Sequence, residues 1–173
     1  MATMPQECQD LINNAYAAAF STCSNGVPNT VPVSMKQVID SETVMVSDQY
    51  MNKTLANLRE NPYAALTVWN DEGGFQVKGS VTYENEGPRF EQVAAQVKEI
   101  LSSMGYDFTS KGVCYIHVEE VYSVTPGEGA GEKIAQRSST ETTLPATLIS
   151  HSMGVAGHRR YRTFRKRNLY NRS

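Results

Sequence analysis

Apolar residues recur every three or four positions in three parts of the chain, a spacing that places them on one face of a helix. Leu11, Ile12 and Ala15 follow this spacing after Pro5, and proline is well tolerated in the first turn of a helix. Asn52 precedes the second such stretch at a position where asparagine favours a helix cap. The pattern predicts helices over residues 6–19, 53–60 and 89–103.

Shorter stretches rich in β-branched and aromatic residues predict six strands, over residues 20–23, 30–39, 43–47, 63–69, 75–83 and 113–124. Asn25-Gly26 separates the first two, and this pair is typical of a hairpin turn because both residues accept positive φ. Strands that follow one another with few helices among them do not form alternating βαβ units. They predict a mainly β fold with flanking helices, built as an antiparallel sheet or small barrel.

The net charge of −2 is the sum of two unlike parts. Residues 1–136 carry 8 basic and 17 acidic side chains, whereas residues 137–173 carry 8 basic side chains and 1 acidic one. A glycine-rich connector over residues 126–131 precedes the change. We therefore expect a domain over residues 1–135 and a basic, flexible tail over residues 136–173. The tail could contact nucleic acid, but a solvated terminus is the favoured interpretation and nucleic acid is not an expected partner.

The chain shows no apolar run near the roughly 18–20 residues that span a bilayer, and it does not begin like a secretory signal. We expect a cytoplasmic protein with no membrane partner. Cys8, Cys23 and Cys114 are odd in number and far apart, which fits reduced thiols better than disulfides. No CxxC or paired histidine motif indicates a metal site.

The first candidate site is Asn52-Lys53-Thr54 at the start of the second predicted helix. A helix N-terminus presents unpaired N–H groups and partial positive charge, so a lysine and a hydroxyl there form a plausible phosphate cradle. An ordinary cap followed by a solvated lysine explains the same residues, and spacing alone favours that alternative.

The second candidate combines residues 33–36 with residues 75–79, both on predicted strands. Lys36 and Lys78 fall in stretches otherwise suited to burial, and a buried lysine needs a partner. A planar ligand with oxygen and nitrogen edges would supply one. Lysines that point to solvent from amphipathic strands are an equally good explanation.

Five motifs, in order, resemble the FMN-binding split-barrel family that includes pyridoxamine 5′-phosphate oxidase. They are Val33-Ser34-Met35-Lys36, Val46-Ser47-Asp48, Asn52-Lys53-Thr54-Leu55, residues 60–66 (Glu-Asn-Pro-Tyr-Ala-Ala-Leu) and Gln76-Val77-Lys78-Gly79. The resemblance covers residues 10–125. It implies a six-stranded antiparallel split β-barrel, FMN as cofactor, and a homodimer with FMN at the subunit interface.

The resemblance also implies which residues hold FMN. Asn52, Lys53 and Thr54 would bind the phosphate, and the strand end at Val46 and Ser47 would lie on the phosphate or ribityl side. The isoalloxazine would lie against Val33, Ser34, Met35 and Lys36, and Gln76 would bond the ring or ribityl chain. The family has basic residues where this chain has Val31 and Asn52, and the arginine-rich C-terminal motif that holds pyridoxal phosphate in the oxidase is absent.

The resemblance implies an FMN-binding flavoprotein that acts as an oxidoreductase or an electron-transfer protein, with a small molecule or a protein as redox partner. We assign no catalytic side chain. One alternative is a true pyridoxamine 5′-phosphate oxidase. Another is a non-catalytic module that binds haem or a deazaflavin on the same barrel, with His117 as the candidate axial ligand of haem.

Overall fold

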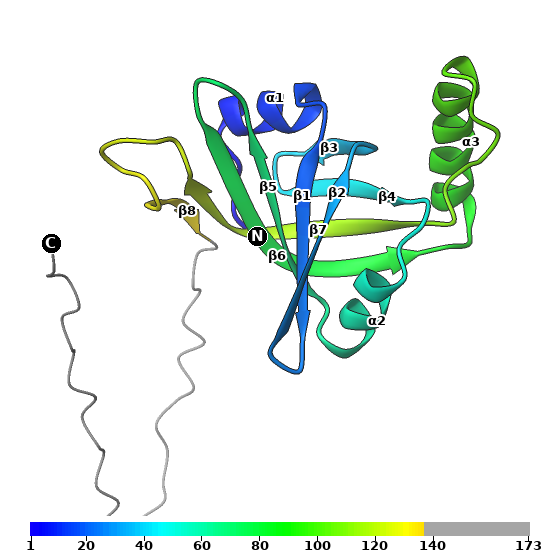
Figure 1. Ribbon diagram of the computed structural model, residues 1–173, viewed down its shortest axis with the longest axis horizontal. Helices are drawn as coiled ribbons and strands as arrows, with labels where there is room; N and C mark the ends of the chain where they lie inside the picture. The colour runs from blue at the N-terminus through cyan, green and yellow to red at the C-terminus, as the bar shows by residue number, and fades with distance from the viewer. Residues whose placement is uncertain (137–173) are drawn as a thin grey trace, which may run out of the picture. The chain divides into compact units, whose positions relative to one another are not determined.

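A computed structural model describes residues 1–136, which fold into three helices and eight strands (Figure 1). The helices are α1 (Gln6–Asn14), α2 (Lys53–Glu60) and α3 (Pro88–Ser103). The strands are β1 (Ala18–Ser24), β2 (Val27–Val33), β3 (Lys36–Asp40), β4 (Thr43–Asp48), β5 (Tyr63–Trp69), β6 (Gly74–Glu84), β7 (Gly112–Ser123) and β8 (Lys133–Gln136).

All the strands join one antiparallel sheet in the order β2-β1-β5-β6-β7-β4-β3, and β8 pairs with β7 beyond the end of β4. The long strands β6 and β7 cross the centre, and β2 and β3 lie at opposite ends of the path, so the sheet does not close (Figure 1). The predicted mainly β split barrel with flanking helices is confirmed. The predicted number of six strands is wrong, since the described residues form eight.

Two differences between the predicted and the observed elements lie before α2. The helix predicted over 6–19 ends at Asn14, because Ala15 takes an extended conformation (φ −62°, ψ 134°). Burial of Ala18 and Phe20 at a spacing of two then places these residues in β1, against β2 and β5. The strand predicted over 30–39 is two strands, because β2 pairs with β1 whereas β3 pairs with β4.

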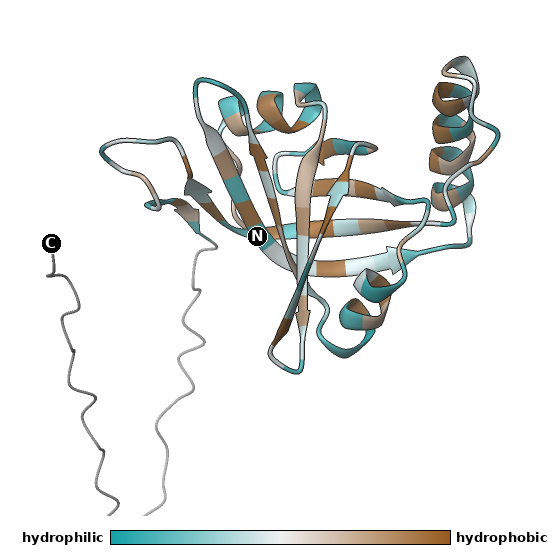
Figure 2. Ribbon diagram, in the orientation of Figure 1, coloured by the Kyte–Doolittle hydropathy of each residue, from teal (hydrophilic) through white to brown (hydrophobic). Residues whose placement is uncertain are grey.

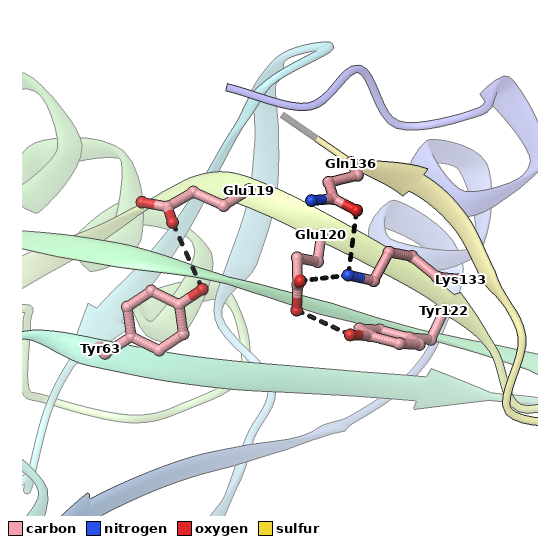
Figure 3. A network of polar contacts seen from close by, with 6 residues as sticks. All are labelled: Tyr63, Glu119, Glu120, Tyr122, Lys133 and Gln136. Atoms are coloured by element: carbon pink, nitrogen blue, oxygen red, sulfur yellow. Dashed lines mark hydrogen bonds and ion pairs between the residues drawn. The ribbon is translucent and has the colours of Figure 1, made fainter. Parts of the chain in front are cut away.

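The third difference is β8, a strand that was not predicted; it follows the glycine-rich connector and reaches Gln136, the first residue assigned to the tail. The glycine-rich residues turn the chain back, so that the N–H of Gly131 donates to the carbonyl of Ser123 at 2.8 Å. Lys133 on β8 donates to Glu120 on β7 at 2.5 Å and to Gln136 at 3.1 Å (Figure 3). Residues 137–173 lie outside the described part of the chain, so the domain boundary and the basic tail stay predictions.

Hydrophobic and polar residues both occur along the strands (Figure 2), and the buried hydrophobic residues form two clusters. The larger cluster fills the space among α1, α2 and the sheet. The smaller one lies beneath α3, where Val93, Val97 and Leu101 pack on Val113 and Tyr115 of β7. No helix within residues 1–136 is both long and apolar enough to span a membrane.

One predicted turn and one β-bulge depend on local backbone geometry. Asn25 and Gly26 both have positive φ, at 50° and 76°, which confirms the predicted hairpin turn between β1 and β2. Gly79 lies where the register of β6 against β7 shifts, and a Cβ there would stand 1.9 Å from the carbonyl oxygen of His117. The close strand approach therefore requires glycine at this position.

Candidate functional site

The loop from β4 to α2 is held in place by a buried carboxylate. Asp48 is 1% exposed; its Oδ1 accepts the N–H of Met51 at 2.7 Å, and its Oδ2 accepts the hydroxyl of Tyr83 at 3.0 Å. Burial, together with the hydrogen bond to the Asp48 carboxylate, raises the pKa of Tyr83 to about 12. The side chain of Asp48 thus fixes the turn that leads into the start of α2.

A cavity of about 290 Å³ lies at the N-terminus of α2, and we call it the α2 cavity. The end of β2 forms one wall, and the end of β4, the following loop and the first turn of α2 form the other. The lining residues are Val31, Pro32, Val33, Ser34, Ser47, Gln49, Tyr50, Met51, Asn52, Lys53 and Thr54.

Asn52 occupies the N-cap position of α2, as predicted, but its side chain makes no capping hydrogen bond. Its backbone (φ −125°, ψ −73°) departs from the extended conformation that a capping side chain needs to reach the first-turn N–H groups. Within residues 1–136, the N–H groups of Lys53, Thr54 and Leu55 have no hydrogen-bond acceptor. Donors and partial positive charge therefore remain available at this end of the helix.

Thr54 connects the α2 cavity to a buried polar cluster. It is 1% exposed, and its Oγ1 accepts a hydrogen bond from the side-chain amide of Asn29 on β2 at 3.1 Å. Asn57, one turn further along α2, donates to Thr22 on β1 at 3.1 Å. These contacts join the helix to the β1–β2 hairpin and fix the helix N-terminus against the end of β2.

Ser47 is 2% exposed, and its hydroxyl group is fully engaged. Its Oγ donates to Ser110 Oγ at 2.7 Å and accepts from Gln49 Nε2 at 2.7 Å, and Ser110 in turn lies 2.6 Å from the carbonyl of Gly112. In this arrangement Ser47 has no proton left for a ligand. Its effect is to orient the amide of Gln49.

A second cavity, of about 510 Å³, lies at the C-terminal end of α3, and we call it the α3 cavity. It shares Ser34, Gln49 and Tyr50 with the α2 cavity, so the two adjoin. Its lining residues are Tyr16, Ser34, Met35, Gln49, Tyr50, Leu101, Met104, Tyr106 and Phe108.

Six of the ten predicted site residues lie together, and the other four lie elsewhere. The α2 cavity brings together Val33, Ser34, Ser47, Asn52, Lys53 and Thr54. Met35 lines the α3 cavity instead, and Val46 is fully buried in the larger core cluster.

Two predicted polar residues are engaged elsewhere. The Lys36 ammonium donates to the carbonyl of Ala15 after α1, and burial lowers its pKa. Gln76 on β6 donates to Thr67 on β5 at 3.0 Å. Lys78 lies over the ring of Tyr122, 4.5 Å from the centroid, so neither lysine of the predicted pair lines the α2 or the α3 cavity.

Sequence reasoning missed Gln49, Tyr50 and Asn29. Gln49 and Tyr50 lie in a loop with no periodicity, and their roles follow from the way Asp48 folds that loop. Asn29 carried no usable signal, because it precedes the strand predicted over residues 30–39 and its partner Thr54 is 25 positions away in the sequence.

Comparison with known proteins agrees with the motifs noted above. The model of the pyridoxamine 5′-phosphate oxidase family matches residues 4–125. An uncharacterized protein of Methanocaldococcus jannaschii is 32% identical over 136 residues, which cover 77% of this chain and 89% of that protein.

Solved structures share the fold. HupZ of Group A Streptococcus has a TM-score of 0.61 at 25% identity, over 74% of this chain and 99% of that chain. An FMN-binding protein of Syntrophomonas wolfei has a TM-score of 0.60 at 20% identity, over 69% of this chain and 85% of that chain.

Proposed function

Because the chain belongs to the pyridoxamine 5′-phosphate oxidase family, we propose that it binds FMN in the α2 cavity and acts as an FMN-dependent oxidoreductase or electron-transfer protein. The observation that carries this proposal is the N-terminus of α2, which opens into a cavity with unpaired N–H groups, a lysine and a hydroxyl group. The FMN-binding protein of Syntrophomonas wolfei is similar in fold, and the family match extends over the whole cavity.

The donor set suits a phosphate. The first-turn N–H groups of α2 donate hydrogen bonds, and the helix dipole and the Lys53 ammonium favour negative charge at the same place. Asn29 can only donate to Thr54, so the single proton of the Thr54 hydroxyl stays free to donate toward the cavity. These three kinds of donor would therefore meet the phosphate of bound FMN.

The remainder of the ligand would follow the end of β2. Val31, Pro32 and Val33 offer an apolar wall, and Ser34 leads from it to the α3 cavity. Bound FMN would supply the electron-transfer chemistry, while these residues position it and limit its contact with water. Gln49, oriented by Ser47, offers an amide at the junction of the two cavities.

We also propose that the protein is a homodimer with FMN near the subunit interface. Support comes from the resemblance to family members that are dimers. It also comes from Tyr16 and Tyr50, which are 93% and 71% exposed beside the two cavities. Large aromatic side chains at one place on a surface are typical of a contact with another molecule.

The test of flavin binding is a visible spectrum of the purified protein before and after incubation with FMN and removal of unbound ligand. We expect retained flavin bands that are shifted from those of free FMN. Parallel incubations with haem and with a deazaflavin separate the proposal from its alternatives. A chain that retains either of these and no FMN would contradict the proposal.

A further inference from the structure

The carboxylate of Asp48 receives a hydrogen bond from a strand that is not its neighbour in the sheet. Asp48 ends β4, Tyr83 lies near the end of β6, and β7 runs between these two strands. The Tyr83 hydroxyl nevertheless donates to Asp48 Oδ2 at 3.0 Å, so its side chain crosses β7. The end of β6 is in this way connected to the loop that leads into α2 (Figure 1).

This crossing is possible because β7 has a glycine at the place where Tyr83 passes. Gly112 pairs with Asp48 in the register of β4 against β7, and a Cβ at Gly112 would overlap the hydroxyl group and the ring of Tyr83. Gly112 does not have a positive φ, so its backbone conformation alone would accept another residue. The close approach of the Tyr83 side chain is therefore what requires glycine here.

Asp48 passes this contact on to the start of α2. Its Oδ1 accepts the N–H of Met51 at 2.7 Å, and the next residue, Asn52, is the N-cap of the helix. Met51 lines the α2 cavity. Asp48, Tyr83 and Gly112 do not line it. Two hydrogen bonds in series thus connect a side chain outside the cavity to the residue before the N-cap of α2.

The position of the Asp48 carboxylate depends on the Tyr83 hydroxyl. Asp48 is 1% exposed, so an oxygen that lost its donor would be left unpaired or would turn toward another group. Burial raises the pKa of Tyr83 to about 12, so the phenol remains a donor at neutral pH. Without this donor the carboxylate would no longer be fixed, and the N–H of Met51 would lose a fixed acceptor.

We propose that Tyr83 is a positioning residue of the flavin site, which acts through Asp48 to place the N-terminus of α2 for the phosphate of FMN. The inference rests on the proposed function for the identity of the ligand. A helix terminus whose N–H groups already point to the place of the anion binds it more tightly, because less order has to be gained on binding. The contribution of Tyr83 is therefore made to the phosphate and not to the flavin ring.

The test compares Tyr83→Phe with the wild type, and each full-length chain is titrated with FMN and with riboflavin. Phenylalanine keeps the ring and removes only the hydroxyl group. We expect the affinity for FMN to fall about fivefold and that for riboflavin to stay within about twofold, since one hydrogen bond to a charged group is lost. Unchanged FMN affinity would overturn the proposal. Equal losses for the two flavins would also overturn it, because they would indicate a general loosening of the domain.

Tyr63→Phe is the matched control. Tyr63 is 36% exposed, as Tyr83 is, and its hydroxyl group also donates to a carboxylate, that of Glu119 at 3.4 Å (Figure 3). Neither Tyr63 nor Glu119 lines the α2 cavity. The control should bind both flavins as the wild type does. A loss of FMN affinity in Tyr63→Phe equal to that in Tyr83→Phe would overturn the assignment.

Hydrogen exchange of the Met51 amide tests the route through Asp48 without any ligand. In the FMN-free chain this amide should exchange faster in Tyr83→Phe than in the wild type, because its acceptor is no longer fixed. Tyr63→Phe should leave its rate unchanged. The same Met51 exchange rate in Tyr83→Phe and the wild type would overturn the proposal.

Gly112→Ala offers a second way to break the same contact, since the added methyl group displaces the Tyr83 hydroxyl. This variant should also bind FMN more weakly. Adding Tyr83→Phe to Gly112→Ala should cost no further affinity, because the two changes remove one interaction. Losses that add in the double variant would overturn the proposal.

Failure of this inference is distinguishable from failure of the proposed function. A wild-type chain that binds no FMN would contradict both. A wild-type chain that binds FMN, but no more tightly than Tyr83→Phe does, would overturn the role of Tyr83 alone and leave the proposed flavin site in place.

Discussion

At Thr54 one hydroxyl group serves both the fold and the proposed site. Its oxygen accepts the Asn29 amide, and its proton remains for a ligand. The helix assignment and the motif at residues 52–54 could be predicted from the sequence. The role of Asn29 could not, because it depends on β2 passing beside α2, a contact between residues 25 positions apart.

Thr54→Val tests this dual role. The variant keeps the shape of the side chain but leaves Asn29 without one acceptor, so the free energy of unfolding in urea should fall by about 1–3 kcal/mol. FMN affinity should fall about fivefold because one phosphate donor is lost. Thr54→Ser should restore both quantities. Wild-type FMN affinity in the Thr54→Val variant would remove the Thr54 hydroxyl from the site.

A variant of Lys53 tests whether positive charge contributes to the proposed phosphate site. Lys53→Ala should weaken FMN binding about threefold to tenfold at low salt, because an exposed ammonium contributes a screened but favourable contact with a dianion. Riboflavin, which lacks the phosphate, should bind the variant and the wild type equally. Lys98→Ala, which removes an exposed lysine on α3, is the control and should change neither affinity. Equal losses for FMN and riboflavin would contradict a phosphate contact.

Elements with a regular spacing of apolar residues and a residue that ends them could be predicted closely. The helix α2 and the strand β5 begin and end where expected. The early end of α1 could not be predicted, because the alanine-rich residues 15–19 suit a helix and a strand equally well and only their pairing with β2 and β5 decides. The break at Ser34–Met35 likewise follows from β2 and β3 joining different ends of the sheet. This break separates Met35 from the other predicted flavin contacts.

The pairing of β8 with β7 should depend on pH, because a network around Glu120 joins the two strands. Hydrogen bonds from Lys133 and then Tyr122 lower the pKa of Glu120, so the ionised form is favoured in the folded chain. A lowered folded pKa means that this stabilisation is present above the ordinary carboxyl pKa and is lost as pH falls through the folded value. We expect β8 to loosen in that acidic range.

Glu120→Gln should produce the same loosening at neutral pH. Hydrogen exchange of the β8 amides measures it, and these amides should exchange faster in the variant while those of β5 stay unchanged. Glu119→Gln is the matched control, since within residues 1–136 the one hydrogen bond that Glu119 accepts is a long one of 3.4 Å from Tyr63 (Figure 3). Equal β8 exchange in wild type and Glu120→Gln would show that the network does not hold the strand.

For the whole molecule, the proposed homodimer predicts a mass in solution of twice the 19.1 kDa of one chain. Light scattering at micromolar concentration with FMN present measures it. Tyr16→Ser removes the most exposed large hydrophobic side chain of residues 1–136 and should weaken the dimer, because interface aromatics contribute strongly to association. A wild-type mass of one chain over the whole concentration range would contradict the dimer.

The acidic part of the chain, residues 1–136, contains both cavities. Every residue that lines either cavity lies between Tyr16 and Phe108, within the acidic part of the chain and within the family match. The proposed phosphate site therefore lies in a domain of net negative charge. If FMN binds there, its phosphate depends on local donors, namely the α2 N-terminus, Lys53 and Thr54, rather than on overall charge.

The central claim is that the N-terminus of α2 binds the phosphate of FMN, and a paired titration tests this claim most directly. The full-length chain is titrated with FMN and with riboflavin under the same conditions, and quenching of flavin fluorescence is recorded. We predict one FMN per chain and at least tenfold weaker binding of riboflavin. No binding of FMN, or equal binding of the two flavins, would contradict the account.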